Sequence, residues 1–349
     1  RSKFLSIDEI NSGYINKTYI VEHLYNGIRS KFILQSLSNI FESHEIVNTN
    51  HKLITDHFNK KINKNYFTFD NKRWEIPNLI KCQSNDLFSY PFESNFWRAM
   101  VYIDQTFSLD VIEDKVMAYE AGNGLAKFHL ICSDIDSSKL RSSIKDFHNT
   151  KYYIDQYIIT LQDYHFMKLD RKLIKRVQDL ICGISNHIRY AEPLFQSLMK
   201  NSIDRNVIHG DPKLNNFLFD IQSKYVVSII DLDTVSSGYF LTDLADCIRS
   251  ICNSAGEEPE NKENVSFEID SFNYFLRGYF SIINQKSNYS FRFLPEFIYL
   301  IILELTIRFL TDFLQSDKYF KIKYQTHNLY RAEVQYQVLS SFISQLPSL

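Results

Sequence analysis

One short segment near the middle of the chain constrains its fold more than any other feature. Residues 206–220 read Asn-Val-Ile-His-Gly-Asp-Pro-Lys-Leu-Asn-Asn-Phe-Leu-Phe-Asp, so that a polar loop is followed by a short apolar run. A second β-rich run, 226–230, ends directly before Asp231. Two short apolar runs on either side of a turn predict a β-hairpin. Such a hairpin would bring together four polar side chains at one edge: His209, Asp211, Asn216 and Asp231.

These side chains have the chemistry that phosphoryl transfer requires. A carboxylate such as Asp211 can orient an attacking hydroxyl and accept its proton, and the oxygens of Asn216 and Asp231 are hard ligands of the kind that Mg²⁺ prefers. Asp and Asn in a loop after a strand are also common turn formers that bond their own backbone. The five-residue offset from Asp211 to Asn216 and the carboxylate after the second strand favour the catalytic interpretation.

The periodicity of the chain changes near residue 100. Helical spacing after that point predicts helices at 115–130, 171–190, 267–284, 295–315 and 327–344. Before it, β-rich runs predict strands at 19–21, 31–35, 67–69, 73–77 and 97–103, with turns at 25–27 and 70–72 and one helix at 43–58. We therefore predict a bilobal α+β fold, with a small β-rich N-terminal lobe (1–100) and a larger helical C-terminal lobe (101–349) that contains the hairpin.

Composition excludes several classes of protein. The net charge of −2 provides no basic excess that would indicate nucleic acid or an anionic membrane as the main partner. The most apolar run, 297–303, stops at Glu304, well short of the ~20 residues of a membrane-spanning helix. The five cysteines contain no C-x-x-C pair, which is typical of reduced thiols rather than a disulfide framework or a zinc site. We expect a cytoplasmic protein.

The pattern H-G-D-x-x-x-x-N followed by I-D-x-D resembles the aminoglycoside phosphotransferase and choline kinase superfamily, which has the protein-kinase-like fold. Within it, the chain is most similar to the N-acetylhexosamine 1-kinase branch, over nearly its whole length. The resemblance implies that ATP and Mg²⁺ are used, with the N-terminal lobe covering the nucleotide and the C-terminal lobe binding the acceptor. The stretches that carry it are 13–19, 33–35, 97–98, 147–150, 209–216, 230–235, 304–312 and 328–332.

The same resemblance implies a role for each residue of the central motif. Asp211 corresponds to the catalytic base, and Asn216 and Asp231 to the magnesium ligands. Asp233, the second acid of I-D-x-D, is expected either to assist at the metal or to anchor its loop. His209, which belongs to the catalytic group, is expected to brace the loop by hydrogen bonding rather than to transfer a proton itself.

The nucleotide is expected to lie against the N-terminal lobe. A turn at 12–18 can aim backbone N–H groups at phosphate oxygens, although a segment with one glycine is by itself more typical of an ordinary hairpin turn. The run 97–103 is expected to cross between the lobes and contact adenine, and a buried edge strand would have the same composition. The nucleotide contacts implied by the resemblance are Gly13, Asn16, Thr18, Gln35, Met100 and Tyr102.

Gln35 departs from the pattern of the wider superfamily. The third strand of such kinases usually carries a lysine that contacts the α- and β-phosphates, and an amide adds no charge there. Lys31 lies on the same face but roughly 13 Å away along an extended strand. The hexosamine kinase branch also reads Leu-Gln here, which makes Gln35 a feature of the branch. A nucleotide-binding pseudokinase is the alternative.

A predicted C-terminal helix is expected to line the acceptor pocket. Glu304, Arg308 and Asp312 recur at i,i+4 spacing among apolar residues, so part of this charged face should be buried and should need partners or ligands. A solvated charge ladder is the alternative. The acidic run 253–260 is expected to be an exposed loop; the alternative is that it faces the cleft, where it would suit either sugar hydroxyls or a cationic acceptor. The candidate acceptor-binding residues are His148, Arg308, Asp312 and Arg331, each of which could instead have a packing or capping role.

We therefore predict an ATP-dependent small-molecule kinase that phosphorylates a sugar hydroxyl, with the anomeric hydroxyl of an N-acetylhexosamine as the candidate. The alternatives are an amino-alcohol or aminoglycoside kinase and a pseudokinase scaffold. A protein kinase is disfavoured, because a helix is expected to start near Asp243, and the short stretch between Asp231 and that helix leaves no room for an activation loop.

Overall fold

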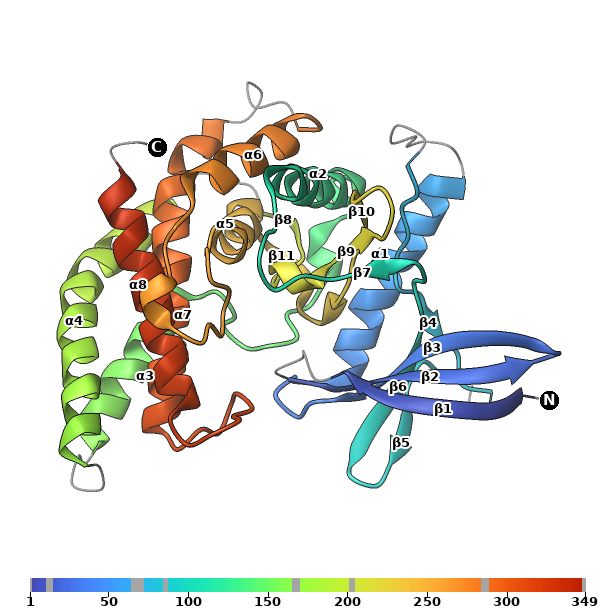
Figure 1. The fold of residues 1–349 in the computed structure, drawn as a ribbon, viewed down its shortest axis with the longest axis horizontal. Coiled ribbons are helices and arrows are strands. Elements are labelled where there is room, and N and C mark those ends of the chain that lie inside the picture. Colours follow the sequence, from blue (N-terminus) through green and yellow to red (C-terminus); the bar gives the residue numbers. More distant parts are fainter. Residues whose placement is uncertain are drawn as a thin grey trace.

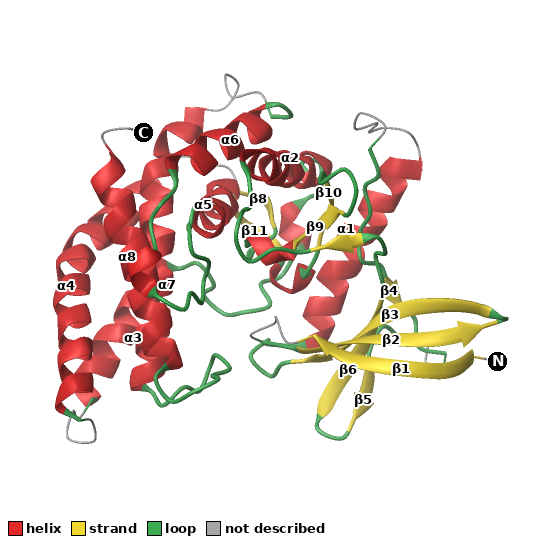
Figure 2. Cartoon of the chain, viewed as in Figure 1, coloured by secondary structure: helices red, strands yellow, loops and turns green. Residues whose placement is uncertain are grey.

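The computed structural model describes residues 2–10, 15–63, 72–83, 87–164, 170–200, 205–283 and 289–346. It has the predicted α+β architecture, with a β-sheet at the N-terminal end of the chain and a larger helical region after it (Figure 1). Figure 2 shows that most of the strands lie in the N-terminal region, while short strands are embedded among the helices.

The N-terminal sheet is antiparallel throughout, in the order β1-β2-β3-β6-β4, with β5 paired to β6. The predicted hairpin is confirmed: β2 and β3 are joined by Asn26 and Gly27, which have φ values of 50° and 83°. Two consecutive left-handed residues give a tight turn whose twist matches that of the strands. The strands are β1 Ser2–Ile10, β2 Lys17–Tyr25, β3 Ile28–Leu37, β4 Leu79–Ile80, β5 Tyr90–Phe92 and β6 Asn95–Val101.

The second predicted hairpin is not present as such. Residues 73–77 form a loop, whose Glu75 N–H donates to Val227 O at 2.8 Å, and residues 67–69 lie outside the described residues. Helix α1, His44–Asn63, connects the sheet to the helical region, because Asn50 Nδ2 donates to Arg141 O and Val235 O at 2.6 and 2.9 Å.

The central hairpin that the sequence predicts is confirmed. Strands β9 and β10 pair antiparallel, and β7 adds to the far side of β9. A second pair is formed by β8, which leads into the polar loop, and β11, which follows the turn after Asp231. The strands are β7 Thr106–Phe107, β8 Arg205–Ile208, β9 Phe217–Asp220, β10 Val226–Ile229 and β11 Ser236–Tyr239.

Helices surround these strands, and one of them, α3, was not predicted. α2 and α6 approach so closely that a Cβ at Gly278 would lie 1.9 Å from Tyr119 O, so glycine is required there. No helix in the described ranges is long and apolar enough to cross a bilayer. The helices are α2 Lys115–Cys132, α3 Thr150–Asp163, α4 Arg171–Lys200, α5 Phe240–Ile251, α6 Ile269–Phe280, α7 Leu294–Leu314 and α8 His327–Gln345.

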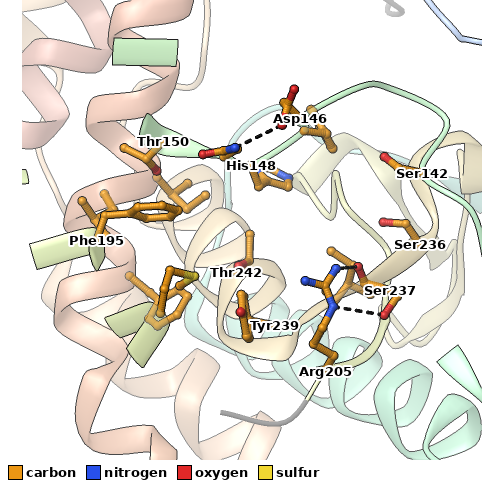
Figure 3. Close-up of a pocket in the computed structure, with 18 residues that line it drawn as sticks. Ser142, Asp146, His148, Thr150, Phe195, Arg205, Ser236, Ser237, Tyr239 and Thr242 are labelled. Atoms are coloured by element: carbon orange, nitrogen blue, oxygen red, sulfur yellow. Dashed lines mark hydrogen bonds between the residues drawn. The ribbon is translucent and has the colours of Figure 1, made fainter. Parts of the chain in front are cut away.

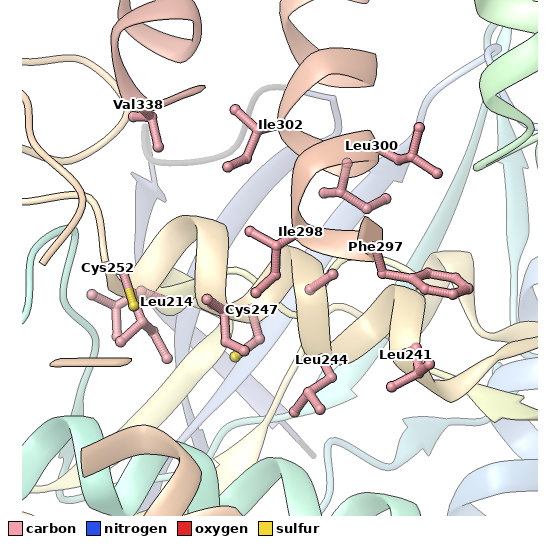
Figure 4. Close-up of a cluster of buried hydrophobic side chains, with 14 of the residues drawn as sticks. Leu214, Leu241, Leu244, Cys247, Cys252, Phe297, Ile298, Leu300, Ile302 and Val338 are labelled. Carbon is pink, nitrogen blue, oxygen red and sulfur yellow. The ribbon is translucent and has the colours of Figure 1, made fainter. Parts of the chain in front are cut away.

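The core extends directly under the polar loop. Leu214, 1% exposed, belongs to the same buried apolar cluster as Leu244 of α5, Ile298 of α7 and Val338 of α8 (Figure 4). Burial of a leucine side chain stabilises a fold by roughly 1.5–3 kcal/mol. The loop that carries the candidate catalytic residues is therefore fixed to the core by one of its own side chains.

Candidate functional site

A buried carboxylate holds the backbone of the polar loop. His209 N and Gly210 N donate to the Asp243 side chain at 2.5 and 2.8 Å, and His129 Nε2 lies 3.1 Å from it. Burial raises the pKa of the Asp243 carboxyl, but these hydrogen bonds and the nearby imidazoles outweigh burial and lower it below its usual value. Gly210 has φ 89°, and a Cβ there would lie 2.6 Å from Thr234 O. The loop is thus tightly held and requires glycine at position 210.

His209 is bonded to backbone groups on both sides of its ring. Its Nε2 lies 2.9 Å from Ile230 O, and Asp211 N donates to its Nδ1 at 3.3 Å. Burial lowers the pKa of this fully buried imidazole. The ring therefore connects the loop to the end of β10, which favours the bracing role for His209 over proton transfer.

Asp211 lies where two cavities meet. Its side chain is 29% exposed and accepts a hydrogen bond from Lys213 Nζ at 2.8 Å. One cavity lies between the N-terminal sheet and the central hairpin, and the other lies toward α7. The residues that line both are Ile15, Asp211, Lys213 and Thr234. A base at this position can reach groups bound on either side.

The two predicted magnesium ligands are adjacent at the end of the hairpin. Ile230 N donates to Asn216 O at 2.8 Å, which fixes the start of β9 beside the end of β10. Asn216 Nδ2 donates to Asp211 O at 2.8 Å, so its side-chain oxygen is the atom available to a cation. Asp231 has φ 65°, a left-handed conformation that is uncommon outside glycine and often marks a functional site.

The charge around Asp231 fits a divalent cation. Burial, together with the carboxylates of Asp233 and Asp211, raises the pKa of Asp231 to about 7. Within the described part of the chain, no residue donates a hydrogen bond to its carboxylate, and no group of three or more His, Cys, Asp or Glu could hold a metal by itself. One carboxylate and one amide oxygen are the sparse protein ligands that Mg²⁺ uses when phosphates complete its shell.

Asp233 points to protein partners rather than to this cation position. Its carboxylate forms an ion pair with Arg98 and accepts a hydrogen bond from Asn16 Nδ2 at 2.7 Å. Asn16 Oδ1 accepts from Ser38 N at 2.9 Å, so both ends of the Asn16 amide are also used within the protein. This placement favours the anchor alternative for Asp233, and it makes Asn16 a support for the loop rather than a side-chain donor to phosphate.

The cavity under the N-terminal sheet has a volume of about 310 Å³ and suits a nucleotide. Met100, Tyr102, Thr18 and Gln35 all line it, as the sequence predicts, and apolar residues of β2, β3 and the hairpin cover its walls. Gly13 lies outside the described residues. An apolar slot that ends in polar and charged groups is the usual form of a cofactor site.

The smaller cavity, about 80 Å³, contains a cation enclosed by aromatic rings. The Arg308 guanidinium lies 5.2 Å from the ring centroid of Phe147, 4.8 Å from that of Tyr153, and 5.6 Å from those of Tyr319 and Phe320. Its contact with Glu304, at 3.9 Å, is long for an ion pair. We call Arg308 and the four aromatic residues around it, Phe147, Tyr153, Tyr319 and Phe320, the arginine cage. The sequence predicts Arg308 as an acceptor contact, and the structure places it in this cavity.

Residue His148 lines the same cavity but is bonded to the protein through both ring nitrogens. Nε2 lies 2.6 Å from Gly210 O and Nδ1 lies 3.2 Å from Glu304 Oε1. Because both partners are acceptors, both nitrogens must carry protons. Burial alone would lower the pKa of this imidazole, but the hydrogen bond and charge of Glu304 outweigh burial and raise it. His148 thus supports the polar loop as a cation.

This arrangement predicts a decline of activity on the alkaline side. The charged form of His148 is stabilised in the fold, so its support is present at low pH and is lost as pH rises through the raised pKa. We expect the kcat of the unaltered protein to fall there. His148→Gln, which cannot titrate, should lower kcat about tenfold and lose that alkaline decline in a kcat–pH profile. The matched control His23→Gln, on β2, should keep the profile; an unchanged profile in His148→Gln would contradict this assignment.

The other two predicted acceptor residues, Asp312 and Arg331, line neither the nucleotide cavity nor the smaller cavity. Asp312 accepts hydrogen bonds from Tyr319 N, Phe320 N and Asn328 Nδ2 at 2.8–2.9 Å. Arg331 pairs with Glu258 through Nε at 2.9 Å and donates to Lys321 O at 3.0 Å. Both residues fix the segment that carries Tyr319 and Phe320, so their contacts favour the packing alternative over direct contact with an acceptor.

The acidic run 253–260 is not the exposed loop that we expected. It is mostly buried or half-buried, because basic side chains neutralise its acids. Glu257 lines the smaller cavity and lies 2.9 Å from Arg249, and Glu258 pairs with Arg331 and, at 3.1 Å, with His327.

A third cavity, of about 370 Å³, lies behind the catalytic loop between α3, α4, α7 and the β8–β11 pair (Figure 3). Arg205 spans its β-side wall and donates to Ser237 O at 2.5 Å. This cavity adjoins the smaller cavity through Phe147, His148 and Ile301, which line both. Asp211, Asn216 and Asp231 are not among its lining residues.

Comparison with known proteins agrees with this geometry. Residues 78–268, more than half of the chain, match the family described as the phosphotransferase enzyme family. A spectinomycin phosphotransferase in complex with ADP and spectinomycin is similar, with a TM-score of 0.62, 12% identity, and 99% of this chain and 93% of that one covered. The microcompartment-associated aminopropanol kinase shares the fold, with a TM-score of 0.58, 14% identity, and 97% of this chain and 93% of that one covered. A choline kinase from Cryptosporidium parvum also shares it, with a TM-score of 0.57, 12% identity, and 99% of this chain and 89% of that one covered.

Proposed function

Since this chain belongs to the phosphotransferase enzyme family, we propose that it transfers the γ-phosphoryl group of ATP to a hydroxyl of a neutral sugar. Membership of the family makes the protein a small-molecule phosphotransferase that acts on an alcohol group and uses ATP with Mg²⁺. The proposal concerns the acceptor, for which the sequence left a sugar, an amino alcohol and an aminoglycoside open.

The arginine cage is the observation that carries the proposal. An aromatic enclosure next to a catalytic base is suited to a cationic ligand, because ring faces attract positive charge. Here Arg308 of the protein already occupies the enclosure, at 4.8 Å from the Tyr153 ring. A second cation in so small a cavity would be repelled, whereas sugar hydroxyls can accept hydrogen bonds from the guanidinium.

The carboxylates of the acceptor side support the same conclusion. A cationic acceptor needs unpaired acids, but each acid that lines this cavity already has a basic partner. Asp211 forms an ion pair with Lys213. Asp246 and Glu257 both pair with Arg249, at 2.7 and 2.9 Å. Glu304 lies 3.2 Å from His148 and accepts from Thr150 at 3.0 Å. A neutral acceptor requires no further charge.

We propose that Asp211 is the base. Its carboxylate would orient the acceptor hydroxyl and take its proton as the acceptor oxygen bonds to the γ-phosphorus, while the bond from that phosphorus to the β–γ bridging oxygen breaks and ADP departs with the electron pair. Asn216 and Asp231 would hold Mg²⁺, which when bound neutralises charge on the phosphates. His209, Asp243 and His148 would keep Asp211 in position, so that much of the rate would come from alignment.

The likeness of the sequence to the N-acetylhexosamine 1-kinase branch refines the proposal to the anomeric hydroxyl of an N-acetylhexosamine. A panel of neutral sugars, N-acetylhexosamines, choline, ethanolamine and aminoglycosides, each with Mg·ATP, would be followed by ADP release. We expect turnover on the neutral sugars, highest on an N-acetylhexosamine, and a sugar 1-phosphate by ³¹P NMR. Turnover confined to cationic acceptors would overturn the sugar proposal, and nucleotide binding without any turnover would favour a pseudokinase.

Replacement of Arg308 tests the acceptor side separately. Arg308→Met removes the guanidinium but keeps an apolar chain among the aromatic rings, so we expect the KM for the sugar to rise about tenfold or more with the KM for ATP unchanged. Arg277, which stacks on Tyr274 at 5.1 Å on the exposed face of α6, gives the matched control Arg277→Met. Equal sugar KM values in the two variants would remove Arg308 from the acceptor site.

A further inference from the structure

The nucleotide cavity contains a buried cation to which the sequence patterns assigned no role. Arg98, in the middle of β6, is 2% exposed, lines this cavity and is paired in register with Gln35 of β3. Its Nε and Nη2 donate to Gln35 Oε1 at 3.0 and 2.5 Å, and Gln35 Nε2 donates to Thr18 Oγ1 at 3.1 Å. The oxygen of the Gln35 amide is therefore directed at Arg98 and its nitrogen at Thr18.

The remaining partners of Arg98 come from other parts of the fold. Nη2 forms the ion pair with Asp233, and Nη1 lies 3.5 Å from Asn48 Oδ1 on α1, a weak contact. In protein kinases a lysine of the third strand contacts the phosphates and pairs with a glutamate of the adjacent helix. Here the third strand offers Gln35 and the helix offers Asn48, both uncharged. The buried cation and its carboxylate are Arg98 and Asp233 instead.

The charges around the cavity leave Arg98 as the cation on the sheet side. Among the described lining residues, the carboxylates are Asp211, Asp231 and Asp233, and the cations are Lys213 and Arg98. Lys213 lines both cavities and is bonded to Asp211, which leaves Arg98 as the cation on the strands of the sheet. A nucleoside triphosphate brings several more negative charges into this acidic cavity, so a fixed cation beside the phosphates would stabilise it strongly in these low-dielectric surroundings.

We propose that Arg98 takes the place of the third-strand lysine and supplies the fixed positive charge for the α- and β-phosphates of ATP. A guanidinium has five N–H donors, so Arg98 can hold Gln35 and Asp233 and still donate to phosphate oxygens from Nη1. Gln35 then orients the guanidinium, and its lack of charge does not impair the site. The inference rests on the proposed function only in taking ATP as the ligand of this cavity.

Calorimetric binding of Mg·ATP, Mg·ADP and adenosine to the full chain tests the proposal without any acceptor. Arg98→Gln should lower the affinity for ATP and for ADP about tenfold or more, and the affinity for adenosine less than about twofold. The double variant Gln35→Lys/Arg98→Gln, which returns a cation to the paired position on β3, should recover most of the ATP affinity. Arg29→Gln, at the exposed end of β3, is the matched control and should bind like the unaltered protein.

Asp233→Asn distinguishes two roles of Arg98: a positive charge that acts directly on the phosphates, and a role limited to holding Asp233 in place. It removes the ion pair but keeps Arg98, so ATP affinity should stay within about threefold. Three results would each overturn the proposal: equal losses of ATP affinity in Arg98→Gln and Asp233→Asn, equal losses of ATP and adenosine affinity in Arg98→Gln, or no loss of ATP affinity in Arg98→Gln.

Thermal unfolding without nucleotide identifies variants that do not fold. If Arg98→Gln is one of them, Arg98→Lys, which keeps the charge, replaces it in the comparison. It should bind ATP within about threefold of the unaltered protein, and a loss shared equally by adenosine would overturn the proposal. If the unaltered protein bound adenosine and ATP equally weakly, the proposed function would fail as well. A negative acceptor panel with normal ATP binding would leave Arg98 unaffected.

Discussion

Asparagine in place of Asp211 is expected to lower kcat by about 10²–10⁴-fold and to leave the affinity for ATP within about threefold. The amide cannot accept the proton of the attacking hydroxyl, but it has nearly the shape of the carboxylate. Because the backbone of the loop is held by Asp243 and His209, the substitution should not displace the neighbouring groups. The measurements are the steady-state rate of ADP release and calorimetric ATP binding.

Asp270 provides the control for this experiment. It lies in the first turn of α6, 67% exposed, where it pairs with Lys115 at 2.9 Å, far along the chain from the catalytic loop. Asp270→Asn should have the kcat of the unaltered protein. If Asp211→Asn turned over as fast as Asp270→Asn, Asp211 would not be the base and the proposed reaction would need another acceptor for the proton.

The second large effect is expected at Asp231. Asp231→Asn should lower kcat about 100-fold or more and raise the Mg²⁺ concentration needed for half-maximal activity, because a charged ligand is replaced by a neutral one. A Mg²⁺ titration of activity at fixed ATP measures both quantities. Stability should not suffer, since the substitution removes one of three clustered carboxylates from a buried site.

Asp220 is the matched control for Asp231, because it lies at the opposite end of the same hairpin. It accepts hydrogen bonds from Gln222 N and Ser223 N at 3.0 and 2.8 Å and so closes the β9–β10 turn. Asp220→Asn should leave the Mg²⁺ dependence unchanged. An identical Mg²⁺ titration in Asp231→Asn would show that this carboxylate does not hold the cation.

The central hairpin and its polar end could be predicted because the information is local. The offset from Asp211 to Asn216 and the position of Asp231 after a short strand are fixed by neighbouring residues. Helix α3 was missed for the opposite reason. Only four of its residues are buried, too few for a clear apolar stripe, and its one local signal is Asn149, which caps the helix by accepting from Tyr152 N at 3.3 Å.

The i,i+4 spacing of Glu304, Arg308 and Asp312 correctly predicted a shared and largely buried face. It could not show that the chain after α7 folds back over one end of that face, so that Asp312 binds the backbone of Tyr319 and Phe320 while Arg308 reaches the cavity. Periodicity gives the direction of a side chain from its helix, but not what covers it.

The partners of Arg98 are non-local in the same way. Gln35 is 63 positions away and Asp233 is 135 positions away, and they meet only because β3 pairs with β6 and the loop after β10 packs against the sheet. Taken alone, Gln35 was interpreted as a feature of the branch and left a pseudokinase as the alternative. With its cross-strand neighbour included, the same residue becomes part of a charged site.

The attachment of the catalytic loop to the protein interior has a consequence for its dynamics. The amides of His209 and Gly210 donate to a carboxylate with no exposed surface, and Leu214 is buried in the apolar core. Their deuterium uptake should therefore be as slow as that of the most protected helices, with no faster local opening. We therefore expect any motion that limits turnover to involve other segments than this loop.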